Sequence, residues 1–321
     1  MATRTKYELK PGMSTRDAFG KTLAALGKDN QDIVVCDADL SKSTMTTYFA
    51  KAFPERFFTC GIAEANMAAV AAGMAAAGKI PFVSSFSCFM LNKGFEQLRV
   101  TVAYPNMNVK VVGTHSGISI GEDGPSQMSV EDIALAGALP GFVVLAPADE
   151  VATQALVKLM VAHKGPVFLR AGRPKVPVVY QPDQQFEIGK AIELVEGTDV
   201  TVIASGLMVA EAIRASEIME AEGVSVRVID IHTIKPIDRE MIAKAAKETG
   251  AIVVAEEHLV DCGLGVRVAQ VVAETNPCIM EFVGIQNTYA ESGTPDGLIE
   301  KYGLLAKDLA VAVRRILARK A

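Results

Sequence analysis

The sequence predicts an α/β protein whose parallel sheets are covered by helices on both faces. Short, continuously apolar segments such as DIVVCDADL at 32–40 and VKVVGT at 109–114 are typical of buried strands, and they alternate with helical segments along the chain. The 321 residues are 50% hydrophobic and 21% charged, which is enough apolar material for a large core. At about 150 residues per domain, this length favours two domains.

Two helices of the first half have N-terminal capping signals. Ser14, with Asp17 three residues later, predicts a helix that runs to Gly27, and Ser129 with Asp132 predicts a capping box for SVEDIALAGAL. The other elements expected in this half are strands at 32–40, 81–86, 109–114, 142–147 and 166–172, and helices at 63–77, 89–103 and 149–163.

Three prolines lie within RPKVPVVYQPDQQ at 173–185, a segment with few helix signals and the best candidate for a domain boundary. A second, smaller alternation of strands and helices follows it. We therefore predict one domain over residues 1–180 and another over 181–321. Residues 1–12, before the first helix, are expected to form a loose arm.

Composition argues against several classes of protein. The formal net charge is -5 and there is no basic run, so neither nucleic acid nor an anionic membrane is an expected partner. The N-terminus has no apolar signal region, and no stretch approaches the roughly 18 apolar residues of a membrane span. The five cysteines are scattered without CxxC spacing, which favours buried thiols over disulfides or a zinc site. We expect a cytoplasmic protein.

The most informative segment of the chain is residues 57–78, where a strand end and Gly61 precede an alanine-rich helix that ends at Gly78. Nine of the fifteen residues from 63 to 77 are alanine, so another helix could approach this one closely. Glu64 lies in its first turn. It is either an acid carried into an apolar contact or a carboxylate favoured there by the helix macrodipole.

The loop GTHSGISIGEDGPSQ at 113–127 is the other informative segment. Its four glycines surround His115, Glu122 and Asp123, between a buried strand and a helix. Loops at the carboxyl ends of parallel strands are where such sheets bind ligands. The alternative is a mobile glycine loop whose polar residues are incidental.

At this point the sequence resembles a known family. Four blocks, in this order, are similar to the pyrimidine-binding domain of transketolases: FTCGIAEANMAAVAAGMAAAG, SSFSCFMLNKGFEQLR, GTHSGISIGEDGPSQMSVED and FVVLAPADE. Residues from about 190 onward resemble the transketolase C-terminal domain. The resemblance implies a thiamine-diphosphate-dependent enzyme that transfers a two-carbon ketol unit between sugar phosphates in carbohydrate metabolism.

Other functions stay open beside this one. The 1-deoxyxylulose-5-phosphate synthases and the beta subunits of two-oxoacid dehydrogenases share the architecture, although the THxxIxxGEDGP form favours transketolase over both. A non-catalytic assembly subunit that kept the fold is a further alternative.

The resemblance also implies a partner. Full-length transketolases begin with a domain that holds the cofactor's diphosphate and Mg²⁺ or Ca²⁺ through a Gly-Asp-Gly…Asn motif, and this sequence contains no GDG. The chain therefore resembles the C-terminal subunit of a split transketolase, which needs an N-terminal subunit. The alanine-rich helix is expected to pack against its own copy through Ala68 and Ala72, giving a homodimer within a heterotetramer.

Matching position by position, the resemblance implies a cofactor site. Glu64 would hydrogen-bond the aminopyrimidine ring of thiamine diphosphate and so promote loss of the proton from the thiazolium carbon. Phe86 and Phe89 would pack on the pyrimidine, and Asp39 matches an acid near the cofactor. Asn92 stands where transketolases often have tyrosine.

The same matching implies a substrate site. His115 and Asp123 join Glu64 as implied catalytic residues, with Asp123 reading a substrate hydroxyl. The residues implied to hold the sugar-phosphate end are Arg16, Ser43, His115 and Arg173, where arginine suits the task through its bidentate fork. Gln127 departs from the usual histidine, and an amide cannot exchange protons near pH 7. The sugar specificity is therefore open.

Overall fold

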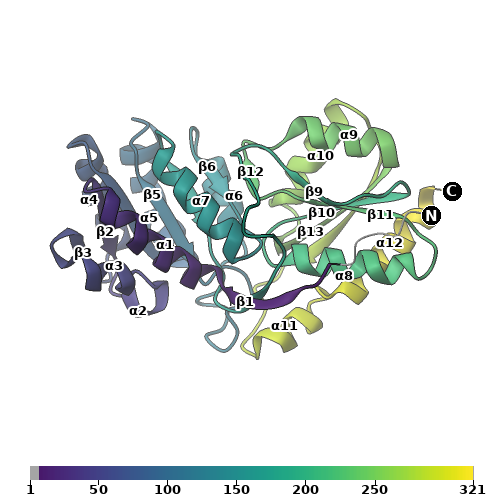
Figure 1. Cartoon of the computed structure of the whole chain (residues 1–321), viewed down its shortest axis with the longest axis horizontal. Coiled ribbons are helices and arrows are strands. Elements are labelled where there is room, and N and C mark those ends of the chain that lie inside the picture. Colours follow the sequence, from purple (N-terminus) through teal and green to yellow (C-terminus); the bar gives the residue numbers. More distant parts are fainter. Residues whose placement is uncertain (1–6, 321) are drawn as a thin grey trace.

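The computed structural model describes residues 7–320 and shows two large sheets side by side, one centred in each half of the chain (Figure 1). The first has seven strands in the order β12-β6-β7-β5-β4-β2-β3, and the second has five in the order β14-β13-β10-β11-β9. Neighbouring strands are parallel except β12 with β6 and β9 with β11. The predicted α/β class is confirmed.

The elements of the first half alternate as the apolar pattern predicts. Its strands are β2 (Ile33–Asp37), β3 (Phe57–Thr59), β4 (Ile80–Phe86), β5 (Lys110–Thr114), β6 (Val143–Leu145) and β7 (Val167–Arg170). Its helices are α1 (Thr15–Asp29), α2 (Ser41–Thr44), α3 (Thr47–Ala52), α4 (Glu64–Ala76), α5 (Ser87–Gln97), α6 (Asp132–Ala138) and α7 (Glu150–Ala162), with a π-helical turn at Leu98–Ala103 after α5.

Helices cover both faces of this sheet. Phe19 of α1 and Met160 of α7 pack in one buried cluster, and Met67 of α4 and Leu91 of α5 pack in another. The strands between them are buried on both sides, which explains why their sequences are continuously apolar rather than alternating.

The second half repeats this architecture on a smaller scale. Its strands are β9 (Ile192–Val195), β10 (Val200–Ala204), β11 (Val226–Asp230), β12 (Thr233–Lys235), β13 (Ala251–Leu259) and β14 (Ile279–Ile285). Its helices are α8 (Met208–Glu220), α9 (Arg239–Thr249), α10 (Leu264–Glu274), α11 (Pro295–Lys301) and α12 (Ala306–Lys320). Because β12 pairs with β6 of the first sheet, the two halves are interlocked, and the division at residue 180 stays a prediction.

The prediction of a loose arm over residues 1–12 is wrong for the residues that lie in strand β1. β1 (Lys10–Ser14) pairs antiparallel with β8 (Lys175–Val178), which lies within the proline-rich segment, and the Tyr7 hydroxyl donates to the Leu194 carbonyl at 2.8 Å. Residues 1–6 lie outside the described residues. Pairing between segments so far apart in sequence leaves no local pattern, so neither strand was expected.

Of the two capping predictions, one is confirmed and one is wrong. The Ser14 hydroxyl accepts a hydrogen bond from the Asp17 amide and caps α1, which ends at Asp29. Ser129 does not cap α6, because the helix begins only at Asp132. The Asp132 carboxylate instead accepts a hydrogen bond from the buried guanidinium of Arg170 at 2.8 Å.

Helix α4 presents a different face to solvent from the one predicted. Ala68 and Ala72 are buried in the chain's own core, so the expected contact through them is wrong. The exposed face carries Ala69, Val70 and Gly73 instead. A helix made almost entirely of small apolar residues has no polar side that would reveal this orientation.

Within residues 7–320, no helix has both the length and the apolar character needed to cross a membrane. All five cysteines are free; Cys36 and Cys88 are buried, as predicted, and the other three are half-buried.

Candidate active site

The predicted site residues gather at the carboxyl edge of the first sheet, where loops follow four neighbouring strands. Asp39 follows β2, Phe86 ends β4, His115 follows β5, and Arg173 follows β7. This is the edge at which open α/β sheets bind ligands. Strand order, rather than sequence order, brings these residues together.

Glu64 is the first residue of α4 and is only 2% exposed. Its Oε1 accepts a hydrogen bond from the Ser85 hydroxyl at 3.1 Å, and its Oε2 lies 3.6 Å from Lys93 Nζ. The Lys93 ammonium also lies 4.5 Å from the centroid of the Phe89 ring. The Lys93 ammonium thus contacts both the buried Glu64 carboxylate and the Phe89 ring.

Aromatic rings connect this carboxylate to the histidine. Phe86 and Phe89 are stacked, with centroids 5.5 Å apart and planes 10° apart. Phe86 also stacks on the His115 imidazole, with centroids 3.8 Å apart and planes 24° apart. The edge therefore presents flat apolar surfaces between two polar centres.

His115 is held as a neutral hydrogen-bonding group. Its Nε2 lies 2.9 Å from Nη1 of Arg16, and arginine can only donate, so Nε2 is the acceptor. Nδ1 then carries the proton and donates to Thr114 Oγ1 at 2.9 Å. Burial, followed by the charges of Arg16 and Arg173, lowers the pKa of His115 to about 3. At neutral pH the ring carries no charge.

Arginines surround the histidine. Nη1 of Arg16 donates to the backbone carbonyl of Ser43 at 2.8 Å, so Ser43 contributes its main chain to this contact. Arg173 donates to the carbonyl of Ile120 and to the Glu122 carboxylate. Burial, then the neighbouring charge of Arg173, lowers the pKa of Arg16. Two cations close enough to repel each other make a favourable place for an anion.

Asp123 interacts with Arg16 through its charge. Its side chain is exposed at the tip of the loop, and its charge raises the pKa of Arg16 against the stronger effect of burial. The loop thus brings Asp123 within electrostatic range of Arg16.

The remaining residues that the resemblance singles out are Gln127, Asp39 and Asn92. The Gln127 carboxamide accepts a hydrogen bond from the Ser126 hydroxyl at 2.5 Å, and its backbone carbonyl accepts from the Cys88 thiol. Asp39 is exposed with a left-handed backbone, at φ +64°. The Asn92 amide donates to Glu131 Oε1 at 2.9 Å.

Sequence reasoning missed Asp37, two residues before Asp39. Its buried carboxylate accepts hydrogen bonds from the Leu40 amide and the hydroxyls of Thr44 and Thr46, at 2.6–2.9 Å. Burial raises its pKa. Asp37 therefore holds the turn that carries Ser43, and an acid at the end of an otherwise apolar strand was the available signal.

Sequence reasoning also missed Lys93, although its separation from Phe89 was an available signal. It follows Phe89 by four residues on α5, a separation that places two side chains on the same helix face. Only the tertiary structure brings Glu64 to that face.

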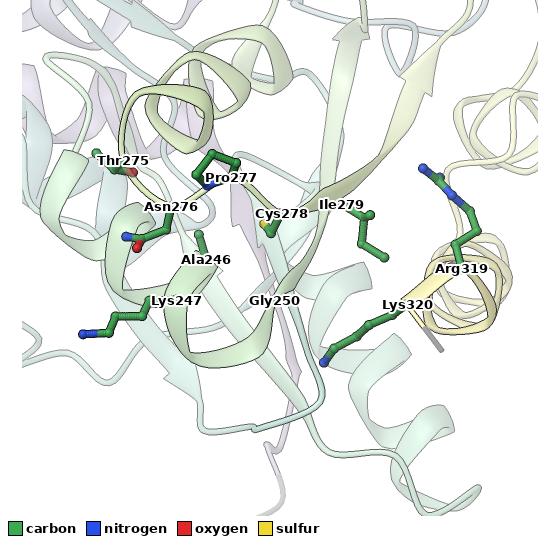
Figure 2. A pocket seen from close by; sticks show the side chains of 10 residues that line it. All are labelled: Ala246, Lys247, Gly250, Thr275, Asn276, Pro277, Cys278, Ile279, Arg319 and Lys320. Atoms are coloured by element: carbon green, nitrogen blue, oxygen red, sulfur yellow. The ribbon is translucent and has the colours of Figure 1, made fainter.

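Within residues 7–320, no group of three or more His, Cys, Asp or Glu side chains is arranged to hold a metal ion. A cavity of about 580 Å³ lies away from the site, in the second half (Figure 2). Two of its basic side chains already have partners: Lys320 donates to the carbonyls of Asp199 and Thr249, and Arg319 pairs with Glu281. The carbonyl ends of α9 and α10 at this cavity further disfavour an anion.

Comparison with known proteins identifies both halves. Residues 11–178 match the family described as "Transketolase, pyrimidine binding domain", and residues 189–309 match "Transketolase, C-terminal domain". A solved structure described as "Split gene transketolase, inactive beta4 tetramer" superposes with a TM-score of 0.90 at 48% identity, covering 97% of this chain and 100% of that one.

Three relatives differ in how much of their own length is matched. The chain is 45% identical to a provisionally named transketolase C-terminal section of Methanocaldococcus jannaschii, over 92% of this chain and 93% of the relative. It is 38% identical to a 6-deoxy-6-sulfo-D-fructose transketolase subunit of Clostridium sp. (strain MSTE9), over 95% of each. It is 36% identical to human transketolase over 99% of this chain, but over only 51% of the human protein.

Proposed function

Because the chain belongs to the transketolase family, with its pyrimidine-binding and C-terminal domains, we propose that it is the C-terminal subunit of a two-chain transketolase. The reaction is transfer of a two-carbon ketol unit between sugar phosphates. The observation that carries this proposal is the buried Glu64 carboxylate, whose neighbour Lys93 also lies over the Phe89 ring.

The residues around Glu64 fit the aminopyrimidine half of thiamine diphosphate. The Lys93 ammonium contacts both the Glu64 carboxylate and the Phe89 ring. An aminopyrimidine could make the same two contacts, because its N–H groups can donate to a carboxylate and its flat ring can stack on an aromatic side chain. When bound, thiamine diphosphate supplies the thiazolium carbon that carries the two-carbon unit. Phe86 and Phe89 would orient its pyrimidine, and Glu64 would hold the proton shared with a ring nitrogen. Asp39 would lie nearby.

The other end of the site suits a sugar phosphate. Arg16 and Arg173 would bind the phosphate, and the carbonyl of Ser43 orients Arg16. Neutral His115 can exchange its bond from Arg16 for one from a substrate hydroxyl, and Asp123 can accept from another. Gln127 would place an amide near the substrate, where transketolases commonly have a histidine.

The cofactor's diphosphate and its Mg²⁺ or Ca²⁺ would be held by a partner subunit with a Gly-Asp-Gly…Asn motif. Two observations support this part of the proposal. The chain covers all of a solved chain described as a split gene transketolase, and 93% of a relative described as a transketolase C-terminal section. The proposed assembly is a heterotetramer with two copies of each chain.

We expect the isolated chain to be inactive and to bind thiamine diphosphate poorly, because most of the cofactor's negative charge would lack neutralising groups. Mixing with the partner subunit should restore both properties. Calorimetry with thiamine diphosphate and Mg²⁺ measures binding, and a sugar-phosphate assay measures ketol transfer. Tight, metal-dependent binding by the chain alone contradicts the split-site proposal. A two-oxoacid decarboxylation product, or 1-deoxyxylulose phosphate, contradicts the proposed reaction.

We further propose that α4 pairs with its own copy through the exposed Ala69 and Gly73, since a Cβ at Gly73 meets nothing within 4 Å. Ala69→Leu should weaken the homodimer by about 1–3 kcal/mol, the usual cost of overpacking a close contact. Ala318→Leu, on the exposed face of α12, is the matched control. Light scattering against concentration measures association, and a monomeric unsubstituted protein rules the pairing out.

A further inference from the structure

The carboxyl edge of the second sheet is filled by the first half of the chain. Strand order in this sheet reverses beside β10, whose neighbours are β13 and β11. Such a reversal is where open α/β sheets usually take a ligand. Here the main chain of residues 117–119, part of the predicted substrate loop, lies against the Glu257 side chain of β13 instead.

One side chain of β13 makes this contact. Glu257 is buried, and its Oε1 accepts a hydrogen bond from the Ser119 amide at 2.6 Å. Gly117 has φ +79°, and a Cβ there would lie 2.1 Å from the Glu257 carboxyl carbon. Glycine at 117 therefore permits both the turn of the loop and the close approach of the carboxylate.

The charge of Glu257 is balanced from the first half of the chain. Nη1 of Arg170 lies 3.9 Å from Glu257 Oε2, and Nη2 donates to the Glu257 carbonyl at 2.8 Å. Arg170 is itself fixed by Asp132. Burial raises the pKa of Glu257 and the charge of Arg170 opposes that effect. The carboxylate is thus held rigidly against the loop.

The other side of this loop reaches the candidate active site. His115 lies two residues before Gly117, and the Ile120 carbonyl, next to Ser119, accepts a hydrogen bond from Arg173. Direct contacts therefore run from Glu257 through Ser119 and Ile120 to Arg173, a predicted phosphate ligand.

We propose that Glu257 is a positioning residue through which the C-terminal domain fixes the substrate loop, and with it His115 and Arg173. The assignment of that loop to sugar-phosphate binding rests on the proposed function. The fixing of the loop by Glu257 can be measured without cofactor, substrate or partner.

The chain provides a matched control in the preceding residue. Glu256 is equally buried on the same strand, and successive strand residues point to opposite faces. Its carboxylate accepts from the amides of Leu264 and Gly265 at 2.7 and 2.8 Å, at the start of α10 in its own domain. A change at Glu256 removes a buried carboxylate without touching the loop.

Hydrogen–deuterium exchange on the full chain tests the contact. Glu257→Ala should speed exchange in residues 115–124 by about 10-fold or more, the scale of a lost buried hydrogen bond to a charged group. Glu256→Ala should speed exchange near residues 262–268 and leave 115–124 unchanged. Glu257→Gln keeps an acceptor for the Ser119 amide and should restore most of the protection. Unchanged exchange at 115–124 in Glu257→Ala, or an equal rise in Glu256→Ala, overturns the proposal.

If Glu257→Ala does not fold, Glu257→Asp replaces it, because this variant keeps the charge beside Arg170 but is too short to reach Ser119. It should loosen the loop in the same way, and unchanged exchange again overturns the proposal.

In the reconstituted enzyme, the loosened variant should raise the KM for the sugar phosphate by about 10-fold while cofactor affinity stays constant. A looser loop with unchanged KM overturns the link to substrate. An absence of ketol transfer in the unsubstituted enzyme contradicts the proposed function and leaves the exchange result standing.

Discussion

Replacing Glu64 by glutamine is expected to slow proton exchange at the thiazolium carbon by about 10²-fold or more, the scale of a positioned acid–base group. Glutamine has nearly the same volume, and its carbonyl can still accept from the Ser85 hydroxyl, which lies 3.1 Å from Glu64. It cannot hold the negative charge that favours a protonated ring nitrogen. Assembly with the partner and cofactor binding should therefore persist.

The measurement is deuterium exchange at that carbon in the reconstituted complex, followed by NMR after acid quench, which separates this step from sugar binding. Glu96→Gln, which removes an exposed carboxylate from the neighbouring helix α5, is the control and should exchange normally. If Glu64→Gln exchanges this proton at the normal rate, Glu64 has no catalytic role and is only a carboxylate at a helix N-terminus.

Replacing Asp230 by asparagine should remove a large pH dependence of stability. Asp230 is fully buried at the end of β11, and its Oδ2 accepts from the Tyr180 hydroxyl at 2.6 Å. Burial raises its pKa to about 8; the Tyr180 hydrogen bond opposes this shift and the charge of Asp149 adds to it. An aspartate in an unfolded chain titrates near pH 4. Between these values the folded state binds the extra proton, so stability falls as the pH rises.

Linkage sets the slope at about 1.4 kcal/mol per pH unit. Asparagine keeps an acceptor for Tyr180 but does not titrate. Relative to the unsubstituted chain, the free energy of unfolding of Asp230→Asn should therefore rise by this amount for each pH unit from 5 to 7, and by less as the pH approaches the folded-state pKa of about 8. Denaturant unfolding of both proteins across this range measures the difference. Asp183→Asn, at an exposed position between the two halves, should leave the slope unchanged. Parallel curves for Asp230→Asn and the unsubstituted chain contradict the prediction.

The local features of the fold could be predicted because they depend on neighbouring residues. Continuous apolar runs mark strands buried on both faces, and Ser14 with Asp17 is sufficient to predict the start of α1. The candidate active-site loop was predictable for the same reason, since glycines around His115 and Asp123 follow a buried strand directly.

Features that depend on distant partners could not be predicted. The pairing of β1 with β8 joins segments more than 150 residues apart. Asp132 has the spacing of a capping residue, yet it binds Arg170 because an ion pair with a buried guanidinium outweighs a local cap. The orientation of Ala68 on α4 was hidden because no polar face marks the outside of that helix.

The sequence by itself determined the α/β class, the alternation of the main strands and helices, and the family, since each depends on periodicity or on contiguous blocks of residues. Only the tertiary structure decided which side chains meet. It pairs Glu64 with Lys93 above Phe89, makes His115 a neutral acceptor for Arg16, and sets Glu257 against the substrate loop. These contacts arise because strand order, rather than sequence order, sets the neighbours at a sheet edge, and because burial strengthens each polar contact that forms there.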